Sequence, residues 1–469
     1  MKKLGVIILM LCVLLCIVPV SAEEPVADAS VVNGCNTLNG QVPFLGTEQL
    51  VNNGKAMILY EAGTDTLMYA DNADAPLPPA SLVKILTALI AVEKGNLDDV
   101  VTVKQPVLST LDPDAAVVEP ALVADEVLTV RDLLHCMMVA SGNDATVVLA
   151  DYILGDQSAF VAEMNRYATE LGCTNTNFVN VHGLHDKNQY TSVRDIARIL
   201  AKAVQNEKFC EIFFAKKYVV PATNKNDARV LVTQNYLLNK DSVIIHYDER
   251  VMGSRTGVSA DGTNNIATFA EVDDMKLICV VMGSSSTLEN GAIKTFGGYG
   301  ETQKLLDLGF TGNKAVQLIY ENQVMKQLSI SGGSSDVTVG THSAVSSVIP
   351  ASFDMDQLDF RYVNEVPLSL PIQEGQRVST LQIWCNNTCI AQTDIYAMSS
   401  VLPAGQVFIQ DEKMPEKETN YGKILLWVFV SIVVVVIVFA VMSYLSRINR
   451  AARKRRQSRR NSRDRRRSR

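Results

Sequence analysis

The sequence contains few of the residues on which common hydrolytic and metal sites are built. Only five of its 469 residues are histidines, and neither an H-E-x-x-H motif nor a cysteine cluster with zinc-site spacing occurs, so the signatures of a zinc enzyme are absent. G-x-S-x-G, the nucleophile motif of many Ser-His-Asp hydrolases, is absent too. Residues 182–186 (His-Gly-Leu-His-Asp) have no third ligand in register, and we predict a structural use for them. We therefore expect no metal ion and no cofactor.

No disulfide framework is visible either. Nine cysteines occur; Cys12 and Cys16 lie in the apolar N-terminal stretch, and the remaining seven are odd in number and mostly isolated. Small disulfide-stapled domains instead carry an even set at regular spacings. Cys385 and Cys389 flank the turn-like residues 386–388 (Asn-Asn-Thr), so a single local bridge between these two is left open.

Long apolar runs lie at the two ends of the chain. Residues 4–18 follow two lysines and precede the small residues 20–22 (Val-Ser-Ala), which is the pattern of a cleaved secretory signal; a retained N-terminal anchor is the alternative. Residues 424–445 carry no charge, and as a helix with a rise of about 1.5 Å per residue they would reach roughly 33 Å, enough to cross a bilayer. A buried globular helix seldom runs this long without a polar face.

Charge is distributed unevenly along the sequence. The formal net charge is −7, yet residues 447–469 hold thirteen Lys or Arg and a single acid, Asp464. Beside a membrane span such a cluster stays on the cytoplasmic side and is attracted to anionic lipid headgroups, an interpretation that we favour over nucleic-acid binding. The sequence thus predicts a single-pass membrane protein whose body lies outside the cytoplasm.

The hydrophobic period changes twice in the body of the chain. Strand-like hairpins are predicted at 57–69 and 265–282, and the helices predicted between and after them are residues 82–92, 130–140, 144–154, 157–171, 192–204 and 299–308. Early and late strands with helices inserted between them predict an α/β domain built on one antiparallel sheet. After residue 310 only short alternating segments remain, which indicates a small β-sandwich or barrel.

Ser81 and Lys84 form a Ser-x-x-Lys pair at the start of the first predicted helix. Residues three apart face the same side of a helix, so the Lys84 amine can reach the Ser81 hydroxyl. Burial and the positive end of the helix dipole both disfavour the protonated amine, and a neutral amine is a competent base. The alternative is a lysine that reaches solvent, but the helix has no polar face for it.

Ser141 and Asn143 lie in a Ser-Gly-Asn turn that follows the apolar residues 136–140. A hydroxyl and a carboxamide on one turn can point into a cleft, the first to pass a proton and the second to hold a substrate amide. The alternative is capping of the next helix, because Ser, Asn and Asp are favoured N-cap residues. The two roles can coexist.

Arg255, Thr256 and Gly257 belong to a predicted strand. Arg255 is a permanent cation that can bind a carboxylate with two parallel hydrogen bonds; the alternative is a solvated arginine paired with Asp248 or Glu249. Gly257 removes a side chain where the backbone of a substrate would approach the strand.

Ser-x-x-Lys, Ser-x-Asn and a basic residue before Thr-Gly are together the motifs of penicillin-recognising serine enzymes. Over about residues 50–400 the chain resembles the serine-type D-alanyl-D-alanine carboxypeptidases, the low-molecular-mass penicillin-binding proteins of the bacterial envelope. The segments that carry the resemblance are 79–84 (Pro-Ala-Ser-Leu-Val-Lys), 141–145 (Ser-Gly-Asn-Asp-Ala), 164–165 (Met-Asn), 178–184 (Phe-Val-Asn-Val-His-Gly-Leu) and 191–195 (Thr-Ser-Val-Arg-Asp).

The resemblance implies a particular architecture. We expect a β-lactamase/transpeptidase-like α/β domain, with a five-stranded antiparallel sheet and a helical subdomain, followed by a small all-β domain and one transmembrane helix in a bacterial cell membrane. The expected order is a signal peptide at 1–22, a leader at 23–50, the catalytic domain at 51–310, the β-rich domain at 311–402, a stalk at 403–423, the membrane helix at 424–445 and a basic cytoplasmic tail at 446–469.

The resemblance also implies the chemistry of the site. Ser81 would attack the carbonyl between the two D-alanines of a peptidoglycan stem peptide, and Lys84 would take its proton. Ser141 would relay a proton to the departing D-alanine, and water would hydrolyse the acyl-enzyme. A β-lactam mimics this substrate and deacylates slowly, so the protein should bind penicillin.

The remaining motif residues would bind the substrate. Asn143 would orient the peptide, and Arg255 with Thr256 and Gly257 would bind the terminal carboxylate. The oxyanion hole would consist of the backbone N–H groups of the nucleophile and of Val258.

Arg255 stands where the family has lysine, and this departure leaves a second reading open. An arginine still binds a carboxylate but cannot donate a proton as a lysine can. The alternative is therefore a catalytically attenuated homologue that binds penicillin and stem peptides. A secreted β-lactamase is a third possibility, against which the β-rich domain and the membrane anchor argue.

Overall fold

The computed structural model describes residues 37–38, 43–45, 54–113, 115–242, 244, 246–289, 292–295 and 297–406. The predicted signal peptide, membrane helix and basic tail lie outside these residues, as does most of the predicted leader. Within the described ranges, no helix is both long enough and apolar enough to cross a membrane.

A five-stranded antiparallel sheet of order β2-β1-β9-β8-β7 forms the centre of the first domain. β1 (Ala56–Glu61) and β2 (Thr66–Asp71) form the first predicted hairpin, and β8 (Asn264–Val272) and β9 (Met275–Ser284) form the second. β7 (Val251–Val258), which carries the Arg-Thr-Gly motif, lies at one end of this order. The prediction that early and late strands share one sheet is confirmed.

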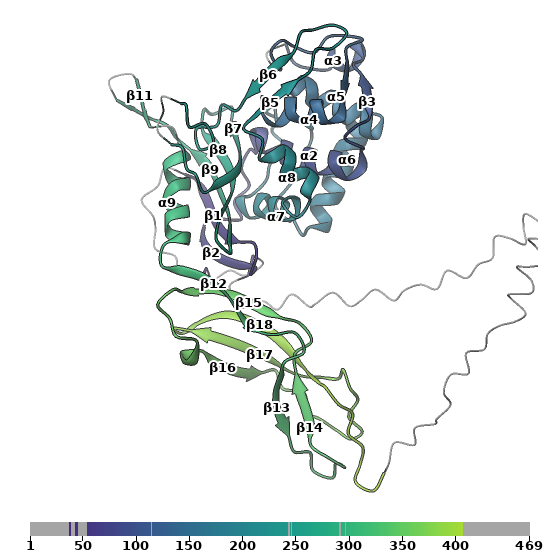
Figure 1. Cartoon of the computed structure of the whole chain (residues 1–469), viewed down its shortest axis with the longest axis vertical. Helices are drawn as coiled ribbons and strands as arrows, with labels where there is room; N and C mark the ends of the chain where they lie inside the picture. Colours follow the sequence, from purple (N-terminus) through teal and green to yellow (C-terminus); the bar gives the residue numbers. More distant parts are fainter. Residues whose placement is uncertain are drawn as a thin grey trace, which may run out of the picture. The chain divides into compact units, whose positions relative to one another are not determined.

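Both faces of the sheet are covered. Ile58 of β1 belongs to the apolar core shared with the helical subdomain, whereas its neighbours Met57 and Leu59 belong to the core on the other face. This alternation is the two-residue period of a strand. Figure 1 shows α9 (Tyr299–Phe310) along one face of the sheet and α7 (Val193–Ala203) along the other.

The helical subdomain is built around α2 (Val83–Lys94), in which every residue from Val83 to Val92 is buried. A helix that is apolar on all sides must be covered on all sides, and the covering helices include α4 (Val130–Met138), α5 (Asn143–Leu154), α6 (Gln157–Glu170), α7 and α8 (Glu207–Phe213). The predicted helices are confirmed, with differences of one or two residues at their ends.

Two short antiparallel strand pairs occur within the segment that the sequence predicts to be mainly helical. β3 (Val100–Thr102) pairs with β4 (Val127–Thr129), and β5 (Lys217–Val220) pairs with β6 (Arg229–Val232). Strands of three or four residues are too short to display a reliable two-residue period. The other short elements of the first domain are the 3-10 turn η1 (Ala80–Leu82), α3 (Gln105–Leu108), β10 (Thr287–Glu289) and β11 (Ala292–Thr295).

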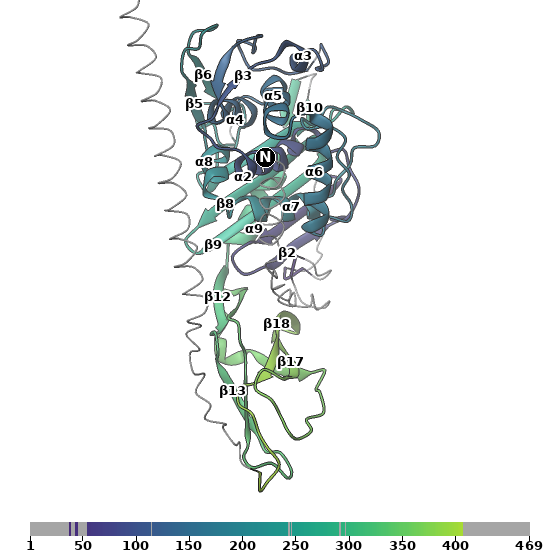
Figure 2. The same cartoon turned by 90° about the vertical axis from the view of Figure 1, so that its right-hand side faces the viewer.

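The second domain is almost entirely β, as predicted. Its main sheet has the order β13-β14-β18-β17-β16, and β12 (Asn313–Ile319) pairs separately with β15 (Val345–Pro350). These strands are coloured green to yellow in Figure 2. The remaining elements are β13 (Val324–Leu328), β14 (Val337–Gly340), η2 (Met355–Gln357), β16 (Asp359–Val363), β17 (Arg377–Cys385) and β18 (Thr388–Ala397).

The open question of a bridge across the β17–β18 turn is answered by the structure. Asn386 and Asn387 form the turn in left-handed conformations, which Asn tolerates better than most residues. Cys385 is a free, buried thiol, whereas Cys389 is disulfide-bonded. The two cysteines are therefore not bridged to each other.

Candidate active site

Ser81 lies in η1, the 3-10 turn that leads directly into α2. Two glycines allow other segments to approach this turn closely. A Cβ on Gly183 would lie 2.0 Å from the Ala80 carbonyl oxygen, and a Cβ on Gly257 would lie 2.6 Å from the Ser81 nitrogen. The space that Gly257 provides is thus taken up by the nucleophile's own backbone, where the sequence predicted space for a substrate.

The Lys84 amine is completely buried one helical turn after Ser81, as predicted. It lies 3.3 Å from Ser81 Oγ, and it donates to Asn143 Oδ1 at 2.6 Å and to the His182 carbonyl oxygen at 2.9 Å. The alternative of a solvent-reaching lysine is excluded by this burial.

The surroundings of Lys84 favour its neutral form. Burial lowers the pKa of the amine well below its ordinary value, the Arg255 cation lowers it further, and the Asp144 carboxylate raises it. A neutral amine has two N–H bonds and one lone pair. Asn143 and His182 supply one acceptor for each N–H, so the lone pair is left for the hydroxyl hydrogen of Ser81. This is the geometry that a general base requires.

Ser141 adopts a left-handed backbone conformation with φ of 63°. It does not cap α5, because the N-cap position is Gly142 and has no side-chain capping bond. The capping alternative for Ser141 is therefore not realised. Such a backbone is uncommon for a residue other than Gly or Asn, and it brings the Ser141 hydroxyl within hydrogen-bonding distance of Arg255.

Arg255 connects the three motifs. Its Nε donates to the Ser81 carbonyl oxygen at 3.2 Å and its Nη1 to the Met138 carbonyl oxygen at 3.0 Å, while Nη2 donates to Ser141 Oγ. It is not paired with Asp248, which instead binds Arg250 at 2.7 Å. Burial lowers the pKa of Arg255 to about 10, so it remains a cation near neutral pH.

A cleft of about 540 Å³ opens over these residues, a size common for small-ligand sites. The structure brings together all the predicted site residues. Lys84 and Arg255 are buried below the cleft, and those that line it are Ser81, Ser141, Asn143, Thr256, Gly257 and Val258.

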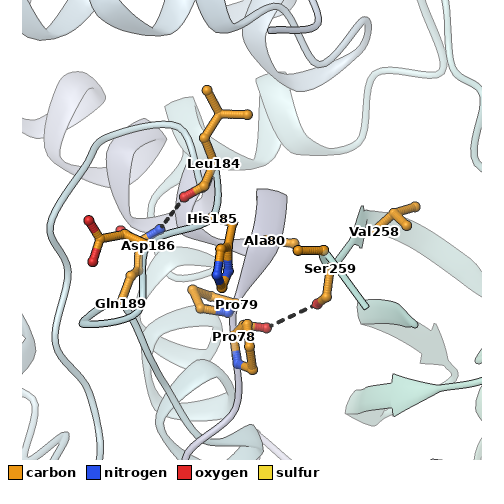
Figure 3. Close-up of a pocket in the computed structure, with 11 residues that line it drawn as sticks. Pro78, Pro79, Ala80, Leu184, His185, Asp186, Gln189, Val258 and Ser259 are labelled. Carbon is orange, nitrogen blue, oxygen red and sulfur yellow. Dashed lines mark hydrogen bonds between the residues drawn. The ribbon is translucent and has the colours of Figure 1, made fainter. Parts of the chain in front are cut away.

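Some residues of the cleft were not predicted as site residues. His182 and His185 line it, and burial together with Lys84 lowers the pKa of His182 to about 4. His185 also borders a narrower pocket next to the cleft, where it lies beside Pro79 and opposite Ser259 (Figure 3). The sequence analysis noted the segment 178–184 as part of the family pattern and predicted a structural use for residues 182–186. The atom of this segment that binds Lys84 is a backbone oxygen, and no side chain in the sequence points to it.

In the part of the chain that the structure describes, no group of three or more His, Cys, Asp or Glu side chains is placed to hold a metal ion.

Comparison with known proteins gives two family matches. Residues 46–286 match the D-alanyl-D-alanine carboxypeptidase family, and residues 314–402 match the C-terminal domain of penicillin-binding protein 5. The chain belongs to the D-alanyl-D-alanine carboxypeptidase family. Its activity is accordingly that of a serine-type D-alanyl-D-alanine carboxypeptidase, and the fold is the β-lactamase/transpeptidase-like α/β fold with its C-terminal β domain.

Individual relatives agree with this assignment to the carboxypeptidases. The chain is 32% identical over 371 residues to D-alanyl-D-alanine carboxypeptidase DacC of Escherichia coli, covering 75% of this chain and 85% of the relative. It is 28% identical over 365 residues to DacF of Bacillus subtilis, covering 76% and 88%. Penicillin-binding protein 5 from Haemophilus influenzae superposes with a TM-score of 0.63 at 28% identity, covering 76% of this chain and all of that one.

Proposed function

We propose that this carboxypeptidase removes the terminal D-alanine from peptidoglycan stem pentapeptides through an acyl-enzyme on Ser81. The observation that carries the proposal is the placement of the buried Lys84 amine, which has one acceptor for each N–H of its neutral form and lies 3.3 Å from the Ser81 hydroxyl. In this proposal Lys84 takes the Ser81 proton as the hydroxyl attacks the scissile carbonyl. β-Lactams would acylate the same hydroxyl.

Ser141 would deliver the proton to the departing D-alanine. Arg255 can only donate, so Ser141 Oγ accepts from Nη2, and the hydroxyl hydrogen of Ser141 is free to point elsewhere. Its position on the cleft wall directs that hydrogen towards a bound substrate. Asn143, whose Oδ1 accepts from Lys84, can use its amide N–H₂ to hold the peptide.

Two groups would bind the negative charges of the substrate. The developing oxyanion would lie between the backbone N–H groups of Ser81 and Val258, at the place where β7 meets η1. The terminal carboxylate would contact Thr256, which lines the cleft. Arg255 is 5% exposed and each of its three nitrogens already donates a hydrogen bond to a protein oxygen, so it would act on this carboxylate mainly through its charge.

The catalytic domain would work outside the cytoplasm of a bacterium, held by a single helix at residues 424–445. The apolar run at 4–18 and the basic residues after 446 support this topology. Protease added to intact spheroplasts should digest the body of the protein and spare an epitope at its C-terminus. Protection of the body would contradict this orientation.

The activity is tested by release of free D-alanine from diacetyl-L-Lys-D-Ala-D-Ala by the detergent-solubilised full chain. We expect release that increases with time for the wild-type protein and none above background for Ser81→Ala, because the acyl-enzyme cannot form. Equal release by the two proteins would contradict the assignment of Ser81 as nucleophile.

A catalytically attenuated homologue remains the second candidate, since Arg255 replaces lysine and is committed to protein oxygens. Its signature would be rapid acylation by labelled penicillin together with negligible D-alanine release in the same preparation. Recovery of release in Arg255→Lys would then assign the loss to this residue.

A further inference from the structure

Residues 115–122, called the wall segment below, reach the catalytic cleft at Ala116. Ala116 lines the cleft, and its carbonyl oxygen accepts a hydrogen bond of 2.8 Å from the Asn143 nitrogen. The wall segment therefore holds the backbone of the Ser141–Asn143 turn from outside. Since Ser141 has an unfavourable left-handed backbone, its conformation depends on such external contacts.

Asp144 holds the wall segment from the side of α5. Its carboxylate is 1% exposed and accepts from the Val118 nitrogen at 3.1 Å and from the Leu122 nitrogen at 3.0 Å. A Cβ on Gly142 would lie 2.7 Å from Asp144 Oδ1 and 3.2 Å from the Val118 nitrogen. This close contact accounts for the glycine between the two predicted site residues of the turn.

Arg229 of β6 holds the same segment from its other side. It is 1% exposed, and its Nε donates to the Pro120 carbonyl oxygen at 2.8 Å. Nη2 lies 3.5 Å from the Ala121 carbonyl oxygen and donates to Glu126 at 3.0 Å. The Asp144 carboxylate thus binds N–H groups at both ends of the stretch 118–122. The Arg229 guanidinium binds carbonyl oxygens in the middle of that stretch.

We propose that Asp144 and Arg229 are positioning residues for acylation, because together they fix the wall segment that keeps the Ser141–Asn143 turn in its working geometry. Neither side chain lines the cleft. Asp144 and Arg229 lie on different elements, α5 and β6, and no hydrogen bond or ion pair joins them. Their effects are joined through the backbone of the wall segment.

The inference rests on the proposed acylation of Ser81 and is tested by the rate constant for acylation by labelled penicillin at saturating concentration. Asp144→Asn keeps the volume of the side chain but turns an N–H donor towards a backbone N–H. Arg229→Lys keeps a cation beside the buried Glu126 while losing the pair of carbonyl contacts. We expect each change to slow acylation about ten- to a hundredfold, as small displacements of reacting groups do.

The decisive measurement is the double variant Asp144→Asn/Arg229→Lys. If both residues hold the same wall segment, either single substitution already displaces it, and the second substitution adds little. The double variant should therefore acylate no more than about twofold more slowly than the slower single variant. Arg194→Met is the matched control, because Arg194 is 6% exposed and likewise donates to a carboxylate, Asp74, and to a backbone carbonyl, that of Leu38. It should acylate like the wild type, and adding it to Asp144→Asn should leave the acylation rate of that variant unchanged.

Two results would overturn the inference. One is multiplication of the two single effects in the Asp144/Arg229 double variant. The other is a loss in Arg194→Met equal to that in Arg229→Lys, which would indicate general destabilisation. Absence of labelling in the wild-type protein would instead refute the proposed function, so the two failures are distinguishable.

Discussion

Lys84→Met should slow the acylation of Ser81 by labelled penicillin about 10²–10⁴-fold, the usual contribution of a positioned general base. Methionine matches the length and apolar character of the lysine chain, so the buried position remains filled. The variant cannot accept the Ser81 proton, and it leaves Asn143 Oδ1 and the His182 carbonyl oxygen without their donor. Stopped-flow or quenched labelling measures the rate directly.

The matched control for Lys84→Met is Thr87→Val, one turn further along α2. Thr87 is also completely buried and bonds to the Val181 carbonyl oxygen at 2.8 Å, so its replacement removes a comparable contact with the same loop. It should lose stability but acylate within a few fold of the wild type. A similar rate for Lys84→Met and the wild type would remove Lys84 from the mechanism.

Gly257→Ala should reduce the acylation rate constant by about a hundredfold and lower the free energy of unfolding by about 1–3 kcal/mol. The new methyl group would lie 2.6 Å from the Ser81 nitrogen and 3.0 Å from the Ala80 Cβ. Either β7 or η1 must move away, and either movement separates the two N–H groups of the predicted oxyanion hole, that of Ser81 on η1 and that of Val258 on β7. Labelling kinetics and thermal unfolding measure the two effects.

Gly300→Ala is the control for Gly257→Ala, because a Cβ at Gly300 would meet nothing within 4 Å. Gly300 lies in the first turn of α9, where alanine should be neutral or slightly stabilising. If Gly257→Ala acylated as fast as Gly300→Ala, the close contact between β7 and the nucleophile turn would not matter for catalysis.

The sequence was informative wherever local chemistry determined the structure. The three-residue spacing of Ser81 and Lys84 correctly predicted the contact between their side chains, because a helix places such residues on one face. The uniformly apolar stretch that follows Lys84 correctly predicted that α2 is buried on all sides. The two long hairpins were recognisable since β1, β2, β8 and β9 are long enough to show turn signals between apolar runs.

The features that the sequence did not predict are very short strands or depend on contacts between residues far apart in the sequence. β3–β4 and β5–β6 are too short to have a period of their own. The His182 carbonyl oxygen, which binds Lys84, is a backbone atom that any residue would supply. The hydrogen bond from Arg229 to the Pro120 carbonyl oxygen joins residues 109 positions apart, and no rule of sequence spacing predicts such a pair.

The contacts that Arg255 makes in the structure differ from those that the sequence suggested for it. The sequence suggested either a ligand for the substrate carboxylate or a solvated ion pair, and neither reading included hydrogen bonds from its guanidinium to backbone oxygens. The structure buries it against two backbone carbonyls and the Ser141 hydroxyl. The planar fork with several donors makes this possible, and a lysine could satisfy fewer of these acceptors.

The pH dependence of Ser81 acylation by labelled penicillin tests most directly whether Lys84 is neutral in the resting enzyme. A base whose pKa is lowered is unprotonated above that pKa, so activity is present there and is lost as the pH falls through it. We predict a rate constant that is already level as the pH approaches the ordinary lysine pKa of 10.5, with its acid limb well below that pKa. A rate that instead rises about tenfold per pH unit up to the ordinary lysine pKa would show a protonated Lys84 and would contradict the account.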